Sequence, residues 1–397
     1  MTDKIHSGNA GKGLSTSGVS LMPAMDTSTA SGCGCGIDPN QNQDQASTYD
    51  RPGYTLCHWV EDFIDTPEGP VPRVQTRLTM RDKAVTAAVR CGIGRHQYAV
   101  APGLYAVGHP DAGSDVLVTA NFKLTFDHLR RELEGLNLWI LVLDTKGVNV
   151  WCAAGKGTFA TGELVHRVGD TGLDKIVDHK RLIVPQLGAT GVSAKAVKAA
   201  TGFRVIYGPI RASDIPKFLK NNRRTDPEMR QVTFGFMERL ILTPVEVQIV
   251  LKPALITVLV LFLLSGIGPG IFSLGSAWAR GLTAIGALVM GIVSGAVVTP
   301  MLLPYIPVRE FALKGIITGC VSALALLVLH PAWTTGAASG LALVLFTITI
   351  SSFLAMNFTG TTPFTSPSGV EKEMKRYIPV QLAGIVIAAG CWLYGAF

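Results

Sequence analysis

The sequence predicts an α/β domain followed by an all-α transmembrane domain of about five helices. Two observations carry this fold class. Strand-like apolar runs alternate with helix-like segments between residues 51 and 235, and from residue 247 onward the chain is dominated by apolar stretches long enough to cross a bilayer. The composition agrees, because 48% of the 397 residues are hydrophobic and only 16% are charged, which is unusual for a purely soluble protein.

Residues 1–50 are rich in Gly, Ser, Thr, Asn and Gln and have almost no apolar periodicity. Such a segment cannot bury enough surface to offset the entropy of ordering, so we expect a disordered N-terminal tail. Cys33 and Cys35 lie close together within it, and two thiols on flexible backbone can capture a soft metal ion. Two ligands alone make no closed site, so an incidental pair is the favoured interpretation.

In residues 51–235 the pattern predicts strands that alternate with helices, which favours a mostly parallel sheet covered by helices, a Rossmann-like arrangement. Ligands of such sheets bind beyond the carboxyl ends of the strands. The expected strands are 115–119, 138–144, 148–153, 181–185 and 203–207, and the expected helices are 125–135, 193–201 and 213–221.

Three Gly-rich turns, at residues 154–157, 186–191 and 207–209, follow expected strands. Each can bring backbone N–H groups against a ligand that carries amides or phosphate. Taken singly, each is also an ordinary connection between a strand and a helix.

The stretch Asn149–Lys156, with the sequence NVWCAAGK, is the strongest candidate for chemistry. Its small residues and Gly155 let a large ligand approach the backbone. Composition alone favours a buried, inert thiol for Cys152, because free cysteine is among the most buried side chains.

After a linker at residues 236–246, the transmembrane domain is expected to occupy residues 247–397. Its spans carry hardly any ionisable residues in their interiors, so an ion relay is poorly supported, although a transporter stays possible. The five expected spans are 247–267, 276–300, 312–330, 338–357 and 378–397.

Charge between the spans predicts the topology. Arg309 and Lys314 in one connection, and Lys372, Lys375 and Arg376 in another, fall on the same side as the α/β domain. With no secretory signal evident at the N-terminus, this places the α/β domain in the cytoplasm and the chain in the inner membrane. The net charge of +7 is explained in the same way, and without a basic stripe interleaved with aromatics we expect no nucleic-acid partner.

Three motifs together, Asn149–Lys156, Leu182–Val192 and Gly202–Pro216, resemble the corrinoid-binding domain of the corrinoid iron–sulfur proteins. The first motif followed by five apolar spans resembles, more narrowly, the corrinoid proteins of the bacterial mercury-methylation pair. The resemblance covers about residues 54–397. It implies a cobalamin-type corrinoid cofactor and transfer of a methyl group from cobalt to inorganic Hg(II), which gives methylmercury.

The resemblance also implies that Cys152 is the lower axial ligand of cobalt. A thiolate is soft, anionic and electron-donating, so in that position it would raise electron density on the methyl carbon. We expect Asn149 to orient the turn or bind a corrin amide, Trp151 to pack beside the ring, and Lys156 to meet a phosphate or the thiolate. The other expected cofactor-binding residues are Val150, Ala153, Ala154, Gly155, Gln186, Gly188, Gly191, Tyr207 and Gly208.

The chain lacks a ferredoxin-like cysteine spacing, so electrons for remethylation have to come from a partner. The resemblance implies a small ferredoxin with two [4Fe–4S] clusters and an upstream methyl donor protein or methyl-folate. Two alternatives stay open: a membrane-attached corrinoid methyl carrier of one-carbon (acetyl-CoA pathway) metabolism, and a membrane transporter with a cytoplasmic ligand-sensing domain. Oligomeric state, the role of the membrane domain and methyl anion versus radical transfer are not determined by the sequence.

Overall fold

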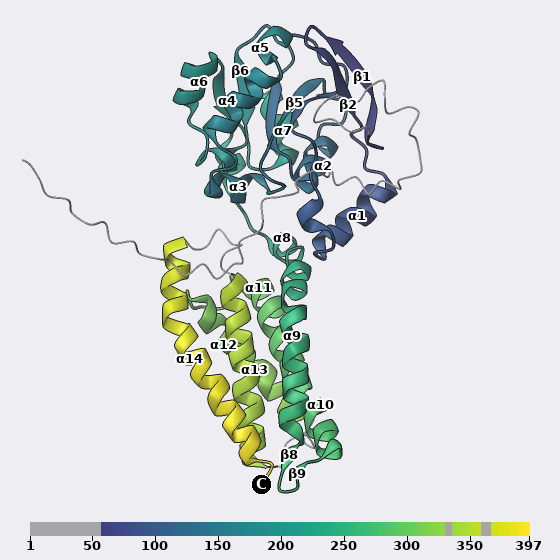
Figure 1. Ribbon diagram of the computed structural model, residues 1–397. Helices are drawn as coiled ribbons and strands as arrows, with labels where there is room; N and C mark the ends of the chain where they lie inside the picture. The colour runs from purple at the N-terminus through teal and green to yellow at the C-terminus, as the bar shows by residue number, and fades with distance from the viewer. Residues whose placement is uncertain (1–56, 330–335, 359–366) are drawn as a thin grey trace, which may run out of the picture. The chain divides into compact units, whose positions relative to one another are not determined.

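The computed structural model describes residues 57–329, 336–358 and 367–397 (Figure 1). The expected tail at residues 1–50, with Cys33 and Cys35, lies outside these ranges. The first part of the described chain is an α/β domain built on a sheet of seven strands. The strands are β1 (Val60–Thr66), β2 (Gly69–Val74), β3 (Gly103–Val107), β4 (Val116–Ala120), β5 (Leu138–Leu143), β6 (Arg181–Val184) and β7 (Arg204–Tyr207).

The strand order is β1-β2-β3-β5-β4-β6-β7. The pairs β2–β3, β4–β5, β4–β6 and β6–β7 are parallel, whereas β1–β2 and β3–β5 are antiparallel. The α/β prediction is confirmed, but the sheet is mixed. The sequence patterns missed β1, β2 and β3, the strands that bring both antiparallel pairs.

Helices cover both faces of the sheet. Helices α3 (Val150–Lys156), α4 (Thr161–Asp170), α5 (Leu173–Ile176) and α6 (Ala194–Thr201) pack on one face, and α2 (Lys123–Arg131) and α7 (Ile215–Lys220) on the other. The strands β3, β4 and β5 are buried along their whole length, which explains their continuous apolar sequences. Because both faces are covered, ligand access is left to the edges of the sheet.

The predicted strand at residues 148–153 is wrong, because this segment begins the helix α3. The side chain of Asn149 accepts a hydrogen bond from the Cys152 N–H at 2.9 Å and so caps the helix. A short apolar run does not distinguish a strand from a buried helix by periodicity, and the Asn cap is the signal that decides here. The helices α2, α6 and α7 do fall within or next to their predicted ranges.

The two strands that follow β4 in the sequence lie on opposite sides of it. The chain first passes from β4 through α2 to β5 on one side, and then from β5 through α3, α4 and α5 to β6 on the other side. A reversal of this kind opens a crevice at the carboxyl ends of the two flanking strands, here β4 and β6. The crevice, rather than any single turn, is where the fold makes room for a ligand.

A buried cluster of charges joins α1 (Met80–Arg90) to α2. Arg130 contacts Asp127 at 2.7 Å and Asp82 at 3.1 Å, and Lys123 forms an ion pair with Asp127. His58 Nε2 lies 2.9 Å from the Asp82 carboxylate. Both carboxylates are almost fully buried, so each depends on these partners for its stability as an anion.

We expect acid to destabilise the protein through Asp82. Burial alone would raise its pKa, but hydrogen bonds from Thr79 and His58 and the charge of Arg130 outweigh burial and hold the pKa below its ordinary value. A depressed pKa stabilises the fold above the unfolded carboxyl pKa, near 4, and this contribution of about 2 kcal/mol is lost as pH falls further. The melting temperature of the full chain in detergent should therefore decrease as the pH is lowered from 6 to 3. In Asp82→Asn the melting temperature should depend less on pH.

The second part of the described chain is helical. It contains α8 (Phe236–Leu240), α9 (Thr243–Gly266), α10 (Leu274–Val293), a π-helical turn (Ser294–Val298), α11 (Thr299–Leu302), α12 (Phe311–Leu329), α13 (Ala337–Asn357) and α14 (Pro367–Tyr394), with a small hairpin of β8 (Ile267–Gly268) and β9 (Ile271–Phe272). Residues expected to form a linker, 236–246, lie in α8 and the start of α9.

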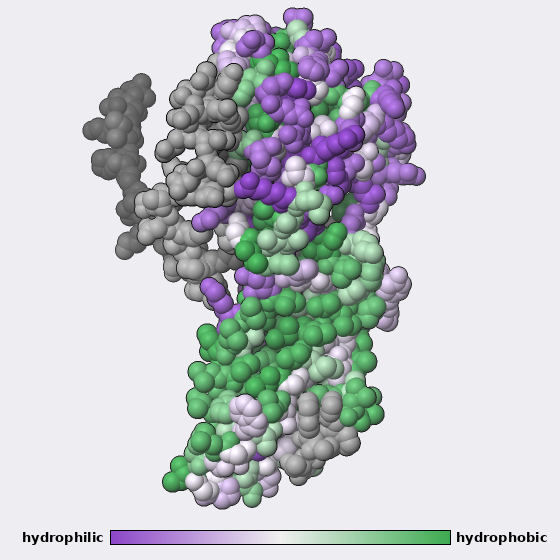
Figure 2. Space-filling model, turned by 90° about the vertical axis from the view of Figure 1, so that its right-hand side faces the viewer, coloured by the Kyte–Doolittle hydropathy of each residue, from purple (hydrophilic) through white to green (hydrophobic). Residues whose placement is uncertain are grey.

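Five helical stretches are long and apolar enough to cross a membrane, which confirms the predicted number. They are Phe236–Gly266, Leu274–Leu302, Phe311–Leu329, Ala337–Asn357 and Gly369–Tyr394. Figure 2 shows hydrophobic residues covering most of the visible face of this part. Inside it, a Cβ on Gly295 or Gly315 would lie 2.5 or 2.6 Å from the carbonyl oxygen of Ser351, so these glycines let helices approach closely.

Candidate functional site

Helix α3 divides the NVWCAAGK stretch between the core and the surface. Val150, Ala153 and Ala154 are buried in the cluster that packs on the sheet. Trp151 and Cys152 are exposed, as are Gly155 and Lys156. The interpretation of Cys152 as a core thiol, which composition favoured, is therefore wrong.

The small size of Ala153 and Ala154 has a structural reason. Both face the core, and the Cα of Ala154 lies only 3.2 Å from where a Cβ on Gly191 would be. Packing therefore accounts for these two alanines without a ligand. Their direct contact with a cofactor stays a prediction.

The side chain of Asn121, directly after β4, makes several hydrogen bonds to the loop before α3. Its Oδ1 accepts hydrogen bonds from the Thr145 N–H at 3.1 Å, the Thr145 hydroxyl at 2.8 Å and the Gly147 N–H at 2.9 Å. Its Nδ2 donates to Asp144 at 3.2 Å. Asn121 thereby fixes the end of β5 and the position from which Asn149 starts the helix.

Replacing Asn121 by alanine is expected to lower the free energy of unfolding by about 2–4 kcal/mol, because Thr145 and Gly147 would lose a shared acceptor in a largely buried place. Hydrogen exchange of amides 144–152 should quicken more than that of the rest of the domain. Asn137→Ala is the matched control, since Asn137 is exposed and accepts one hydrogen bond, from the His109 N–H. Equal effects of the two changes would contradict the positioning role.

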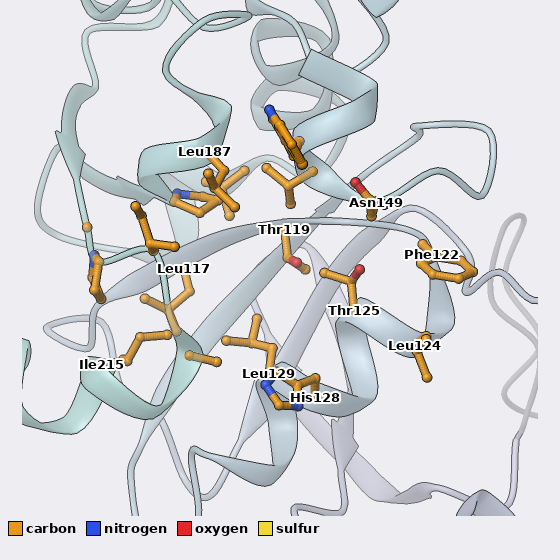
Figure 3. A pocket seen from close by; sticks show the side chains of 18 of the residues that line it. Leu117, Thr119, Phe122, Leu124, Thr125, His128, Leu129, Asn149, Leu187 and Ile215 are labelled. Carbon is orange, nitrogen blue, oxygen red and sulfur yellow. The ribbon is translucent and has the colours of Figure 1, made fainter. Parts of the chain in front are cut away.

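A pocket opens at the crevice between β4 and β6 (Figure 3). Figure 3 shows Asn149 and Leu187 at one end, His128 and Leu129 at the other, and Thr119 between them. Most of the side chains that line it are apolar, with few polar groups, which is typical of small-molecule sites. In the α/β domain the walls also include Leu117, Phe122, Leu124, Thr125, Val150, Trp151, Ile183, Pro185, Gly208, Pro209 and Ile215.

Gln186 follows β6 beside this pocket and keeps one buried group unsatisfied. Its Oε1 has no hydrogen-bond partner among the described residues, although it is shielded from solvent. A buried acceptor without a donor costs about 1–3 kcal/mol. The cost is removed when a ligand supplies an N–H group, so Gln186 is the predicted residue that best fits a direct polar contact.

The predicted glycines have internal roles instead. We expected the Gly-rich turns to offer backbone N–H groups to a ligand. The N–H groups of Gly188, Gly191 and Gly208 instead donate to the carbonyl oxygens of Pro185, Gly188 and Val184, respectively, so these three are already used within the protein. A Cβ on Gly188 would also lie 2.4 Å from the ring of Phe159. Close packing explains these residues.

Tyr207 contributes a further internal bond, because its hydroxyl donates to the Val192 carbonyl at 2.6 Å. Of the predicted residues, Asn149, Val150, Trp151 and Gly208 line the pocket. Gln186 does not line it but lies in the sequence between the lining residues Pro185 and Leu187. Sequence reasoning missed Thr119 and Asn121, although both end a predicted strand at the edge where a ligand is expected.

Comparison with known proteins links this region to corrinoid proteins. Residues 94–219 match the family described as CO dehydrogenase/acetyl-CoA synthase delta subunit. The gamma subunit of the acetyl-CoA decarbonylase/synthase complex of Methanopyrus kandleri is 39% identical over 129 residues, 32% of this chain and 27% of that protein. That of Methanothermobacter thermautotrophicus is 33% identical over 167 residues, 42% of this chain and 35% of its own length.

The corrinoid/iron–sulfur protein large subunit of Moorella thermoacetica is 33% identical over 121 residues, 30% of this chain and 27% of that protein. The chain therefore spans about a quarter to a third of the length of these relatives. The family match contains α3, Gln186 and the strands β4 to β7, whereas α1 and all five apolar helices lie outside it. The similarity thus coincides with the crevice and its pocket.

Proposed function

We propose that this protein is a membrane-attached corrinoid protein that carries a methyl group on cobalt and delivers it to an acceptor. The observation that carries the proposal is the exposed thiol of Cys152 on α3, the residue after Trp151, which lines a pocket in a domain similar to corrinoid/iron–sulfur subunits. The five apolar helices supply the attachment. We also propose that the α/β domain is of the Rossmann-like class.

The residues present fit a corrinoid. Its macrocycle has apolar faces and a rim of amides, and the pocket offers apolar walls with Asn149 as a polar lining residue. Gln186, between the lining residues Pro185 and Leu187, carries a buried Oε1 without a donor among the described residues. The exposed indole of Trp151 provides a flat apolar surface beside the thiol. A planar ligand with amide groups would satisfy both features at once.

Each side chain then has a defined task. Asn149 caps α3 and fixes the direction of the following turn, while Asn121 fixes the loop that leads into it. Cys152, as a thiolate, offers a soft anionic donor to cobalt. When bound, the corrinoid supplies the cobalt–carbon bond that is broken in methyl transfer.

Two acceptors have support. The relatives are gamma subunits of acetyl-CoA decarbonylase/synthase complexes, which favours a one-carbon acceptor of that pathway and supports this acceptor more directly than any other. Inorganic Hg(II) is the second acceptor, favoured by the resemblance of NVWCAAGK to the mercury-methylation proteins and by the exposed position of Cys152. A thiolate donor to cobalt would supply electron density, which would suit methyl transfer to an electrophilic metal acceptor.

Partners follow from the same proposal. The relatives are subunits of multi-protein complexes, so we infer that protein partners dock at the exposed face of α3. The small ferredoxin with two [4Fe–4S] clusters and the methyl-folate or protein donor are the specific partners proposed from the resemblance. The inner membrane, with the α/β domain in the cytoplasm, is proposed from the distribution of Lys and Arg.

The full chain in detergent micelles tests these proposals. Titration with aquocobalamin, followed by absorbance, should show saturable binding, and failure to bind any corrinoid would overturn the function. The protein loaded with methylcobalamin is then mixed with Hg(II), with free methylcobalamin as the control. Methylmercury formed well above the free rate identifies Hg(II) as an acceptor, whereas binding without such formation supports the one-carbon acceptor.

A further inference from the structure

The pocket has a cationic end that the candidate site does not use. Arg90, at the end of α1, Arg95, in the short 3-10 helix η2 (Arg95–Gln97), and His128, on α2, all line it. Asn149 and Trp151 line the same pocket at the end near Cys152. One ligand can therefore contact the α3 end and the cationic end together.

Arg90 and Arg95 differ from the other buried cations of the domain. Lys123 and Arg130 are paired with Asp82 and Asp127, but no carboxylate of the described residues lies within 4 Å of the guanidinium nitrogens of Arg90 or Arg95. Arg95 instead lies over the ring of Phe122, 5.3 Å from its centroid.

Like charges gather here. Burial lowers the pKa of Arg90, and the positive charges of Arg95 and Arg131 lower it further. Arg131 Nη2 also lies 3.2 Å from Nδ1 of His128. Arg131 is paired with Glu132, and Glu246 acts on Arg95 at longer range, but among the described residues no carboxylate forms an ion pair with Arg90 or Arg95. The guanidinium geometry of these two side chains suits a phosphate.

We propose that Arg90 and Arg95 form a subsite for the phosphodiester of the nucleotide loop of a bound corrinoid. The inference rests on the proposed function. If Cys152 occupies the lower face of cobalt, the nucleotide base that would otherwise bind there is released, and the loop with its single negative charge needs a place in the protein. The pocket provides one, because its mostly apolar lining includes residues of α3 as well as Arg90 and Arg95.

One of the two residues of this subsite, Arg90, lies outside the residues that match the family. Arg90 precedes residues 94–219, so the match to the family model does not include it. The contact of Asp82 with Arg130 ties the first turn of α1 to α2, and Arg90 is at the other end of the same helix. The structure thus adds a residue to the pocket that the family match could not have indicated.

The test compares two corrinoids that differ in the phosphodiester. Aquocobalamin contains the nucleotide loop, and aquocobinamide lacks it. Full-length wild type, Arg90→Gln, Arg95→Gln and the double variant are titrated with each and followed by absorbance. Each single change should weaken cobalamin binding by about tenfold, while cobinamide binding stays within about twofold of wild type, since a charge-assisted hydrogen bond is lost only with cobalamin.

Arg77→Gln is the matched control, because Arg77 is an exposed arginine of the same domain, paired with Glu134, and lies away from the pocket lining. It should leave both affinities unchanged. Equal weakening of both corrinoids by Arg90→Gln and Arg95→Gln, or no weakening of either, would overturn the subsite while the proposed function stands. Inorganic phosphate that stabilises wild type but never competes with cobalamin would overturn it too, since it would indicate a site for free phosphate. Failure of wild type to bind either corrinoid would overturn the proposed function itself.

Discussion

Replacement of Cys152 by alanine is expected to lower the rate of methyl transfer by more than about 100-fold, because even changes to groups that only support a metal ligand cost 10- to 100-fold. The absorption spectrum of the bound corrinoid should change as well, since the sulfur ligand is lost. Stability should change by less than about 0.5 kcal/mol, because the thiol is exposed and no other group depends on it for packing.

Cys91→Ala is the matched control for this prediction. Cys91 is also an exposed free thiol of the α/β domain, but it follows α1 and so lies outside α3, the helix that carries Cys152. It should retain full activity and an unchanged spectrum. Full activity and an unaltered spectrum in Cys152→Ala and Cys152→His would remove the thiolate from the mechanism, even if corrinoid binding persists.

The sequence pattern singled out the stretch Asn149–Lys156 as the candidate site but misassigned its local structure. The run from Val148 to Ala153 is apolar enough for a strand, and only the Asn149 cap reveals that it is the start of a helix. That difference decides which side chains are available, because the helix turns Ala153 and Ala154 inward and leaves Trp151 and Cys152 exposed.

Residues that act through long-range contacts could not be found in the same way. Asn121 is 24 residues from Thr145, and Arg90 lies on α1, the helix whose first turn is tied to α2 by the contact of Asp82 with Arg130. No local pattern encodes such pairs. The glycines show the converse case, since Gly188 was correctly picked as special but its reason is the ring of Phe159 rather than a ligand.

The five apolar spans were predictable because the bilayer imposes a length and a composition that few other environments require. The mixed sheet was not predicted. β1 is a polar edge strand with a weak apolar signal, whereas the short strand β3 was missed although it is buried along its whole length. The contacts that join α1 and β1 to the rest of the domain include specific polar pairs, such as Asp82 with Arg130 and Asp62 with Arg73.

The second large effect is expected at Gly191, which lies where the turn after β6 meets the turn after α3. A Cβ there would be 2.1 Å from the carbonyl oxygen of Phe159 and 3.2 Å from the Cα of Ala154, and both neighbours are backbone atoms that cannot rotate away. Gly191→Ala must therefore displace α3 or the segment that follows it. We expect a loss of about 3 kcal/mol in the free energy of unfolding, at the upper end for overpacking.

The same displacement should move Cys152, since it shares α3 with Ala154. Corrinoid affinity should fall by about tenfold or more, and the spectrum of the remaining complex should shift toward that of Cys152→Ala, because a sulfur about 1 Å out of place loses its bond to cobalt. Gly162→Ala is the control: Gly162 is an exposed helical residue of α4 with open space around its Cβ, so alanine should be neutral or slightly stabilising there. A Gly191→Ala protein as stable as wild type, with an unchanged spectrum, would show that the contact between the two turns does not position the thiol.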